Sequence, residues 1–381
     1  MAPGLVLDSL VELGPDSIVL DPMSGSGTVL RQAAELGHTA IGFDVDPLAV
    51  LMARVWTTPV NDTEIEAAYH QLLELAASEE CRVPFQHPDE ETNDFIGYWF
   101  GDSQIVDISR LSKGISLLEK SDDFAISVPV IDVLKLNLSR IIVTKEQCAS
   151  LARDTSHSRP HRVAVTSEYN VNDGYERSLR HMRQRLTAAP PPGRTHVLEG
   201  DARDLSEVWS QSVDAVVTSP PYLNAIDYLR GHRMSLVWLG WTMKELRRIR
   251  SESIGAERGL SHPAAKDIEL IVNAMIGSSE LPSRHLNMVT RYAYDLHKLM
   301  AQIKRVLKIA GRATLVVGNS CLKGNFIQNS DGVAMAAGLF GLKEISRSER
   351  DLPTSSRYLP ITGQALGKRM RTETVLTFNA T

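Results

Sequence analysis

The segment from residue 17 to residue 44 constrains the fold more than any other part of the sequence. An apolar run leads into a glycine-rich stretch, Asp21–Thr28, and an amphipathic pattern over 29–36 then stops at Gly37. A second apolar run ends on Asp44. Glycine is frequent just after a helix because it tolerates a left-handed backbone. The order strand, glycine loop, helix, strand and acid predicts half of a doubly wound α/β sheet.

The glycine-rich stretch suits a ligand without phosphates. It reads Asp-Pro-Met-Ser-Gly-Ser-Gly-Thr, which is tighter than the spacing that holds a pyrophosphate. Gly25 and Gly27 let the backbone approach a ligand, and the helix N-terminus that follows can bind a carboxylate. Asp44 is placed to accept hydrogen bonds from ribose hydroxyls. The pattern therefore predicts a nucleoside ligand, with an ordinary strand-to-helix turn as the alternative.

A second motif, Ser219-Pro220-Pro221-Tyr222, follows the apolar run 213–218. Neither proline has an N–H to donate, so a strand ends here and the backbone is held extended where ligands of open α/β sheets bind. Backbone carbonyls and the Ser219 hydroxyl can accept hydrogen bonds from an amine, and the Tyr222 ring offers a flat face beside them. The motif predicts a planar base with an exocyclic amine, and a proline-rich turn after a core strand is the alternative.

Together the two motifs resemble those of the exocyclic-amino DNA methyltransferases, which use S-adenosylmethionine to make N4-methylcytosine or N6-methyladenine. The resemblance covers roughly residues 1–59 and 195–381. It implies an α/β, Rossmann-like class I methyltransferase fold with a doubly wound, mostly parallel sheet. A helix over 299–307, a turn at 308–312 and a strand over 313–317 fit that fold. The segment 372–378 is expected to form an antiparallel edge strand.

The resemblance also assigns roles to individual residues. It implies that S-adenosyl-L-methionine is bound by the first motif and by two further acids, namely Asp21, Pro22, Ser24, Gly25, Gly27, Thr28, Asp44 and Asp201. For catalysis it implies Ser219, Pro220, Pro221 and Tyr222. No metal is expected, and the three cysteines form no metal-binding pattern. Cys81, Cys148 and Cys321 are all expected to be packing residues.

The target implied by the resemblance is a base flipped out of DNA and stacked on Tyr222. Ser-Pro-Pro-Tyr is more typical of N4-cytosine enzymes, so cytosine is the expected base. An N6-adenine enzyme, an RNA-directed relative and a non-catalytic nucleic-acid-binding subunit remain as alternatives. A role in restriction-modification or epigenetic marking follows, with a cognate restriction endonuclease as a conceivable companion. The oligomeric state does not follow from the sequence.

The long spacing between Asp44 and Asp201 indicates an insertion. A minimal fold needs about one helix there, so 60–190 is expected to be a mainly helical insertion and a target-recognition region, while 1–59 and 191–381 form the catalytic domain. Within the insertion, 84–93 reads as a loop and 95–100 as a compact aromatic cluster. A second irregular segment, 251–284, is expected to be a mobile loop over the site, and it is the alternative to 60–190 as the target-recognition region.

Charge and composition bear on the partner and the compartment. The formal net charge is −5, whereas nucleic-acid-binding domains are usually basic. Basic residues nevertheless gather in two places expected to contact DNA, listed here: Arg177, Arg180 and Arg183, then Arg230 and Arg233. A solvated surface helix is the alternative for the first group. No apolar run could span a membrane and no signal peptide is visible, so a cytoplasmic protein is expected.

Overall fold

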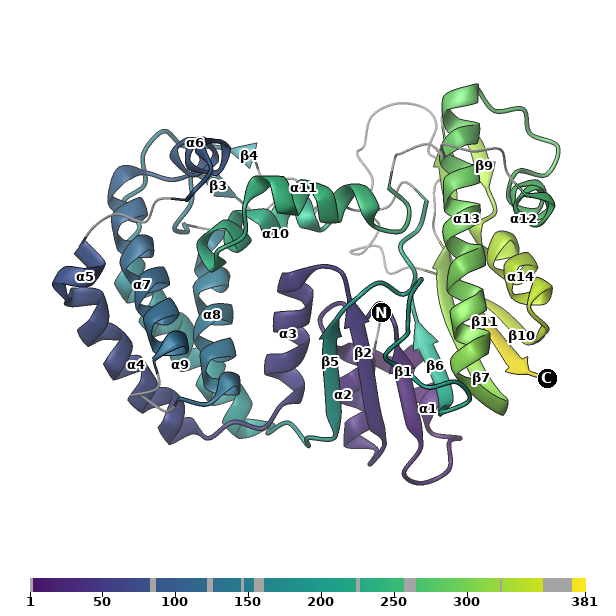
Figure 1. Ribbon diagram of the computed structural model, residues 1–381, viewed down its shortest axis with the longest axis horizontal. Helices are drawn as coiled ribbons and strands as arrows, with labels where there is room; N and C mark the ends of the chain where they lie inside the picture. The colour runs from purple at the N-terminus through teal and green to yellow at the C-terminus, as the bar shows by residue number, and fades with distance from the viewer. Residues whose placement is uncertain are drawn as a thin grey trace. The chain divides into compact units, whose positions relative to one another are not determined.

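The computed structural model describes residues 3–82, 87–121, 126–144, 147–153, 161–223, 227–256, 265–322, 324–351 and 372–381. The chain forms two compact units, whose elements are labelled in Figure 1. Unit 1 comprises Met1–Val45, Arg194–Ile226 and Ser251–Thr381. Unit 2 comprises Asp46–Gly193 and Asp227–Arg250.

Apart from the three residues 191–193, these units differ from the expected division of the chain in two segments. Residues 46–59 and 227–250 fall in unit 2, although both were expected with the sheet. Burial explains the difference, because Leu51 and Trp238 belong to the same apolar core as Leu134 within unit 2. The helical unit therefore contains chain from both sides of the expected insertion.

Unit 1 is an α/β layer structure. Its helices and strands in chain order are α1 (Pro3–Leu10), β1 (Ile18–Asp21), α2 (Thr28–Glu35), β2 (Thr39–Asp44), β5 (Thr195–Glu199), β6 (Val213–Thr218), α12 (Lys266–Ile276), α13 (Ser283–Val306), β7 (Leu307–Gly318), β8 (Ser320–Leu322), β9 (Asn325–Ile327), α14 (Asn329–Leu339), β10 (Leu342–Asp351) and β11 (Thr372–Ala380). The expected strands before and after the glycine loop are present.

A sheet of seven strands runs through the described part of unit 1 in the order β10-β11-β7-β6-β1-β2-β5. Strands β5, β2, β1, β6 and β7 pair in parallel. Strand β11 pairs antiparallel with both β7 and β10. The expected antiparallel strand therefore exists, but it lies one position inside the edge, which β10 forms. The chain order reverses between β1 and β6, the point where ligands bind in such sheets.

Helices cover both faces of this sheet. Leu20, Val216 and Leu315 face a core shared with α12, α13 and α14, which Figure 1 shows gathered beside β7, β10 and β11. On the other face, α2 lies so close to β2 that a Cβ added at Gly42 would stand 2.4 Å from Leu30 Cδ1. Glycine at this position lets helix and strand approach, as the doubly wound fold requires.

The expected turn at 308–312 occurs inside strand β7. Val213 pairs with Leu307 and Ala215 pairs with Arg312, so β7 carries extra residues between these two pairs. Ala310 adopts a left-handed backbone with φ 61°. The turn is therefore a bulge, and pairing starts again at the apolar stretch predicted as the strand.

Unit 2 is mainly helical, as expected for the insertion. Its elements are α3 (Pro47–Thr57), α4 (Asp62–Ala77), α5 (Glu79–Arg82), α6 (Glu90–Trp99), α7 (Asp102–Lys120), α8 (Val128–Ile142), β3 (Ala152–Arg153), β4 (His161–Arg162), α9 (Val171–Ala188), α10 (Leu229–Leu236) and the 3-10 helix η1 (Val237–Leu239). Helix α11 (Met243–Glu252) begins in unit 2, and its last residues fall in unit 1.

Three local expectations are corrected. Residues 90–93, expected in a loop, begin helix α6, because Asp89 caps it by accepting a bond from the Thr92 amide. The aromatic cluster is part of that helix. Residues 266–276, expected in a mobile loop, form α12, and 257–264 lie outside the described residues. Cys321 is exposed, whereas the other two cysteines are buried. No described helix is both long and apolar enough to cross a membrane.

Candidate active site

The two sequence motifs meet where the strand order reverses. Thr218, at the end of β6, donates a hydrogen bond of 2.7 Å from its hydroxyl to Asp21 Oδ1 at the end of β1. The Met23 amide donates to the same carboxylate oxygen at 3.2 Å. Burial raises the pKa of Asp21 from 3.8 to about 7, against the opposing effect of these two bonds. Asp21 therefore joins the glycine loop to the strand that precedes Ser219.

The glycine loop is fixed against the end of β2. The Gly25 amide donates to Asp44 Oδ2 at 2.8 Å, and the Ser24 amide donates to the Phe43 carbonyl at 2.8 Å. Gly25 and Gly27 have φ values of 52° and 83°, which a residue with a Cβ adopts only with strain. The acid expected to bind ribose thus also holds the loop. Pro22 is buried beside it, and Thr28 begins α2.

Two features of this loop fit the polar end of S-adenosylmethionine. The Ser24 hydroxyl is buried and has no hydrogen-bond partner among the described residues. Helix α2 begins at Thr28 without a side-chain cap, so amide groups of its first turn are available to an anion. A ligand carboxylate could accept hydrogen bonds from the amides of the first turn of α2, and a polar group of the same ligand could bond with the Ser24 hydroxyl.

Ser219 has its hydroxyl hydrogen committed to the neighbouring strand. Its Oγ donates to the Val316 carbonyl of β7 at 3.0 Å. A hydroxyl that donates in this way keeps its lone pairs for accepting. Pro220 is buried and Pro221 exposed, and no described group donates to the Pro220 carbonyl. The loop therefore presents acceptors after β6.

Tyr222 is anchored through its hydroxyl. The hydroxyl donates to Glu373 Oε1 of β11 at 2.9 Å. Arg350 of β10 in turn donates to the other oxygen, Glu373 Oε2, at 2.6 Å. The half-buried ring is thus tied to a strand that is remote in sequence. Sequence reasoning did not single out Glu373, and an acid that starts a terminal strand carries no local signal of such a role.

Asp201, expected to reach the adenine of the cofactor, is held by an arginine. Arg203 donates from Nε to Asp201 Oδ1 at 2.9 Å and from Nη1 to Asp295 Oδ1 of α13 at 2.6 Å. Asp295 is fully buried. Burial acts to lower the pKa of Arg203, but its bonds with the two acids raise it overall. Asp295 also escaped sequence reasoning, although an acid within an apolar helical stripe between Tyr292 and Leu296 is a usable signal.

The arginines expected to bind DNA from α9 have different surroundings. Arg183 donates to Asp62 at 2.7 Å and to Glu66 at 3.2 Å, both on α4. Arg180 pairs with Glu176 at 2.7 Å. Arg177 makes no ion pair with a described carboxylate and lies in a groove of unit 2. Only Arg177 of the three therefore has a charge that no described acid compensates.

The two arginines after the catalytic motif lie in α10. Arg230 pairs with Asp227 at 3.7 Å. Arg233 stacks over the Phe95 ring at 5.1 Å, and burial together with the nearby Arg230 and Arg250 lowers its pKa. Both belong to unit 2, whereas the Ser-Pro-Pro-Tyr motif belongs to unit 1. Residues 224–226 between them lie outside the described part of the chain.

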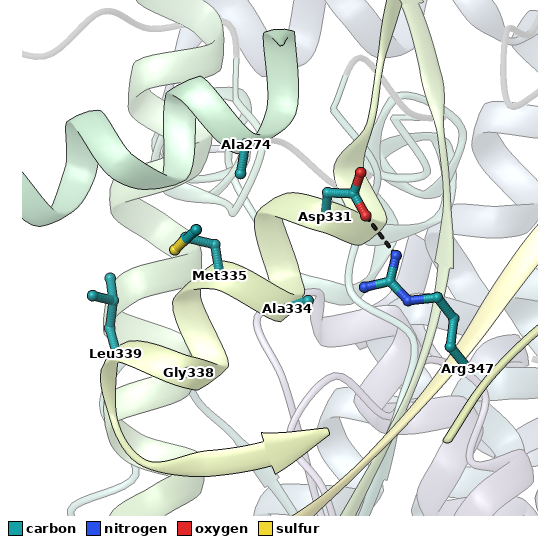
Figure 2. A pocket seen from close by; sticks show the side chains of 7 residues that line it. All are labelled: Ala274, Asp331, Ala334, Met335, Gly338, Leu339 and Arg347. Carbon is teal, nitrogen blue, oxygen red and sulfur yellow. Dashed lines mark hydrogen bonds and ion pairs between the residues drawn. The ribbon is translucent and has the colours of Figure 1, made fainter. Parts of the chain in front are cut away.

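A shallow pocket of about 420 Å³ on unit 1 contains none of the expected site residues. Figure 2 shows its small apolar lining from α12 and α14, with Asp331 paired to Arg347. That pair leaves neither charge open to a ligand. Among the described residues, no group of three or more ligating side chains could hold a metal ion.

The fold and the two sequence motifs agree at this edge of the sheet. An antiparallel strand between β10 and β7, a glycine loop after β1 and an acid ending β2 occur with Ser-Pro-Pro-Tyr after β6. The fold is the Rossmann-like α/β fold of the class I methyltransferases.

Comparison with known proteins identifies its relatives within that class. The chain is 24% identical over 277 residues to Type II methyltransferase M.BsoBI of Geobacillus stearothermophilus, which covers 65% of this chain and 53% of that protein. It is 22% identical over 333 residues to Type II methyltransferase M.MvaI of Kocuria varians, covering 80% of this chain and 70% of that protein. The chain thus spans about half the length of the first relative.

No protein-family model matches the chain. Among solved structures, geranyl diphosphate C-methyltransferase from Streptomyces coelicolor A3(2) covers 100% of this chain and 77% of its own, with 8% identity and a TM-score of 0.38. The observed strand order, rather than this overlay, defines the fold.

Proposed function

We propose that this chain transfers a methyl group from S-adenosylmethionine to the exocyclic N4 amine of cytosine in DNA. The observation that carries the proposal is the hydrogen bond from Ser219 to the Val316 carbonyl, which leaves lone pairs of the Ser219 oxygen to accept from an amine. The two Type II methyltransferase relatives support a modification role for the chain.

Acceptors at this loop meet the chemical need of an aromatic amine. The lone pair of such an amine is delocalised into the ring, so the nitrogen is a poor nucleophile. Accepting its two hydrogens at Ser219 Oγ and at the Pro220 carbonyl favours a pyramidal nitrogen with an available lone pair. No thiol or hydroxyl nucleophile of the protein is needed, because the amine itself attacks the methyl group and gives up one of its two hydrogens as a proton. Positioning supplies most of the rate in a displacement between two bound substrates.

The glycine loop and its acids would hold the cofactor. Ser24 and the first turn of α2 would bind its amino-acid end, and Asp44 would accept hydrogen bonds from its ribose. When bound, S-adenosylmethionine supplies an electrophilic methyl group on sulfur. We assign Asp21 to joining the two motifs, because both of its hydrogen bonds are made within the protein. Asp201 would act at the adenine end, oriented by Arg203.

Tyr222 would stack on a base that has left the duplex. The hydrogen bond from its hydroxyl to Glu373 would help to orient the ring for this contact. Cytosine rather than adenine is favoured by the Ser-Pro-Pro-Tyr form of the motif alone. A restriction-modification role with a companion endonuclease is part of this proposal and rests on the kind of relatives found.

The decisive experiment is methylation of genomic DNA with a deuterated methyl donor. Purified protein is incubated with DNA or with RNA, and the digested nucleosides are identified by mass spectrometry. We expect labelled N4-methylcytosine from DNA. Labelled N6-methyladenine would identify adenine as the target base, and label in RNA alone would identify RNA as the substrate. No label in any nucleoside would contradict the proposal.

Variants of the catalytic loop separate chemistry from cofactor binding. Ser219→Ala and Tyr222→Ala should each lower the methylation rate by about a hundredfold, as for loss of a positioned group, while cofactor affinity stays within about twofold. Ser212→Ala is a matched control, because Ser212 lies at the opposite end of β6 and donates to the Trp209 carbonyl. Wild-type rates in both loop variants would remove Ser219 and Tyr222 from the mechanism.

A further inference from the structure

Unit 2 contains a groove of about 660 Å³ between helices α8 and α9. Arg140 enters it from α8, and Arg177 and His181 enter it from α9. Among the described residues, no carboxylate lines the groove. It is therefore a concave surface in which the charged side chains are basic.

The two helices that carry these side chains are fixed to each other by buried hydrogen bonds. Asn137 of α8 donates from Nδ2 to the Tyr175 carbonyl of α9 at 2.9 Å. Tyr175 donates its hydroxyl back to the Leu134 carbonyl at 2.9 Å. Tyr175 is 1% exposed, so both bonds lie in the core of the unit. The positions of the basic residues are consequently set by a rigid pair of helices.

One wall of the groove is formed by Tyr169 lying against Gly174. A Cβ added at Gly174 would stand 2.0 Å from the Tyr169 hydroxyl, so only glycine lets the ring occupy this place. Tyr169 forms a side-chain hydrogen bond with Arg177. Burial raises the pKa of the Tyr169 phenol, and this hydrogen bond opposes that effect. Arg177 is therefore held at the groove by a neutral partner that leaves its charge uncompensated.

Arg140 is also uncompensated. Its Nε donates to the neutral Ser178 hydroxyl at 3.4 Å, and it forms no ion pair with a described carboxylate. Burial, followed by the charge of nearby Arg185, lowers its pKa. Arg180 and Arg183 differ, because acids of the protein pair with both. The fold thus gathers like charges in one groove and neutralises the neighbouring ones.

Spacing along α9 matches a repeating anion. Arg177, His181 and Arg185 follow one another at intervals of four residues, so they lie along one face of the helix. The stripe is about 12 Å long at about 1.5 Å per residue. Phosphates of one DNA strand advance about 3.4 Å each along the duplex axis, so the stripe covers about three of them.

We infer that this groove, with Arg140 and Arg177 in its lining and Arg185 near Arg140, is the site at which unit 2 binds the sugar–phosphate backbone of DNA. The inference rests on the proposed function for the nature of the polyanion. It assigns contact with the DNA backbone to Arg177. Arg180 and Arg183 are not assigned such contacts, because acids of the protein pair with them. Such contacts fix the position of a protein on the duplex without reading its sequence.

The test is DNA binding as a function of salt, because each phosphate contact contributes to that dependence. Fluorescence anisotropy with a labelled duplex of arbitrary sequence and about 30 base pairs gives the affinity between about 50 and 200 mM salt. The slope of log affinity against log salt is negative, and its magnitude should decrease by about 0.9 for Arg177→Gln and by about 1.8 for the double variant Arg140→Gln/Arg177→Gln. The recognition sequence need not be known.

Two matched variants keep the test specific. Arg180→Gln removes the same charge from the same helix, and its slope should equal that of the wild type because Arg180 is already paired. Arg140→Lys/Arg177→Lys should restore the slope, since lysine also neutralises a phosphate. Equal slopes for the double glutamine variant and the wild type, with unchanged circular dichroism, would overturn the inference. Loss of slope that lysine does not restore would also overturn it.

A free anion is the other occupant to be tested. If inorganic phosphate at constant ionic strength binds the wild type but not the double glutamine variant, while both proteins bind the duplex with equal affinity, the groove binds small anions and the DNA assignment fails. Methylation of the same samples separates this inference from the proposed function. Methylated DNA with unchanged slopes would contradict the groove alone, whereas changed slopes without methylation would contradict the proposed function alone.

Discussion

Tyr222 and Glu373 connect the loop after β6 to the antiparallel strand β11 of the sheet. The tyrosine hydroxyl donates to Glu373 Oε1 at 2.9 Å, and Arg350 holds the other carboxylate oxygen at 2.6 Å. A hydrogen bond to a charged acceptor contributes about 1.5–3 kcal/mol. The orientation of the Tyr222 ring is therefore set by the last two strands of the sheet, β10 and β11.

Removing Glu373 should impair the chemistry without affecting the cofactor. In Glu373→Ala the Tyr222 hydroxyl loses its acceptor and the ring gains freedom, so we expect kcat for DNA methylation to fall by about tenfold or more. Calorimetric affinity for S-adenosylmethionine should stay within about twofold. Glu344→Ala is the control, because Glu344 pairs with Arg347 on β10 and has no hydrogen bond with the described residues of the loop. Equal kcat values for the two variants would remove Glu373 from the positioning role.

Asp44 should be required for cofactor binding. Its carboxylate holds the Gly25 amide, and we propose that it also accepts from the ribose, so Asp44→Ala should loosen the loop and remove an acceptor. We expect the dissociation constant of S-adenosylmethionine, measured by calorimetry, to rise by about tenfold or more. Asp16→Ala, which breaks an exposed pair with Arg194 in the same unit, should leave it unchanged. An unaltered constant in Asp44→Ala would contradict the ribose role.

The parts of the fold that follow from the sequence are those encoded locally. The glycine loop, α2 and β2 lie within about thirty residues, and the apolar periods and glycines that specify them are contiguous. Strand β10 was not foreseen. It reads Leu-Lys-Glu-Ile-Ser-Arg-Ser-Glu-Arg-Asp and is mostly exposed, so it lacks the alternation that marks a half-buried strand. Its pairing with β11 creates the strand instead.

Site residues that escaped prediction depend on distant partners. Glu373 is 151 positions from Tyr222, and Asp295 is 92 positions from Arg203. No motif links such pairs, because their proximity arises only when the sheet is assembled. For the same reason the sequence could not separate Arg177 from Arg183, whose charge is compensated by Asp62 of another helix.

Asp21 should make stability depend on pH. Its carboxyl is buried, and its pKa is raised from 3.8 to about 7. Between these two values the unfolded chain releases a proton that the folded chain retains, so the free energy of unfolding falls as the pH rises. Asp21→Asn has no such proton. We expect the free energy of unfolding of the variant, measured by urea unfolding, to increase by about 2 kcal/mol relative to that of the wild type as the pH rises from 5 to 8.

The control for this pH dependence is Asp62, whose pKa is lowered by its hydrogen bond with Arg183. Its stabilising effect is complete above the ordinary pKa of an aspartate and is lost only as the pH falls below it. The difference between Asp62→Asn and the wild type should therefore be constant from pH 5 to pH 8. A constant difference for Asp21→Asn as well would show that Asp21 is ionised throughout this range in the folded protein.

Arg203 and Asp295 should be energetically coupled. Asp295 is fully buried and Arg203 is 13% exposed, so Arg203→Met leaves a buried carboxylate without its main partner. We expect a loss of about 3 kcal/mol in the free energy of unfolding, typical of breaking a buried pair. The double variant Arg203→Met/Asp295→Asn should lose less than the sum of the two single changes. Arg312→Met, which breaks an exposed pair with Glu12, should cost less than about 1 kcal/mol. Strict additivity in the cycle, measured by urea unfolding at pH 7, would show that the two side chains contribute independently.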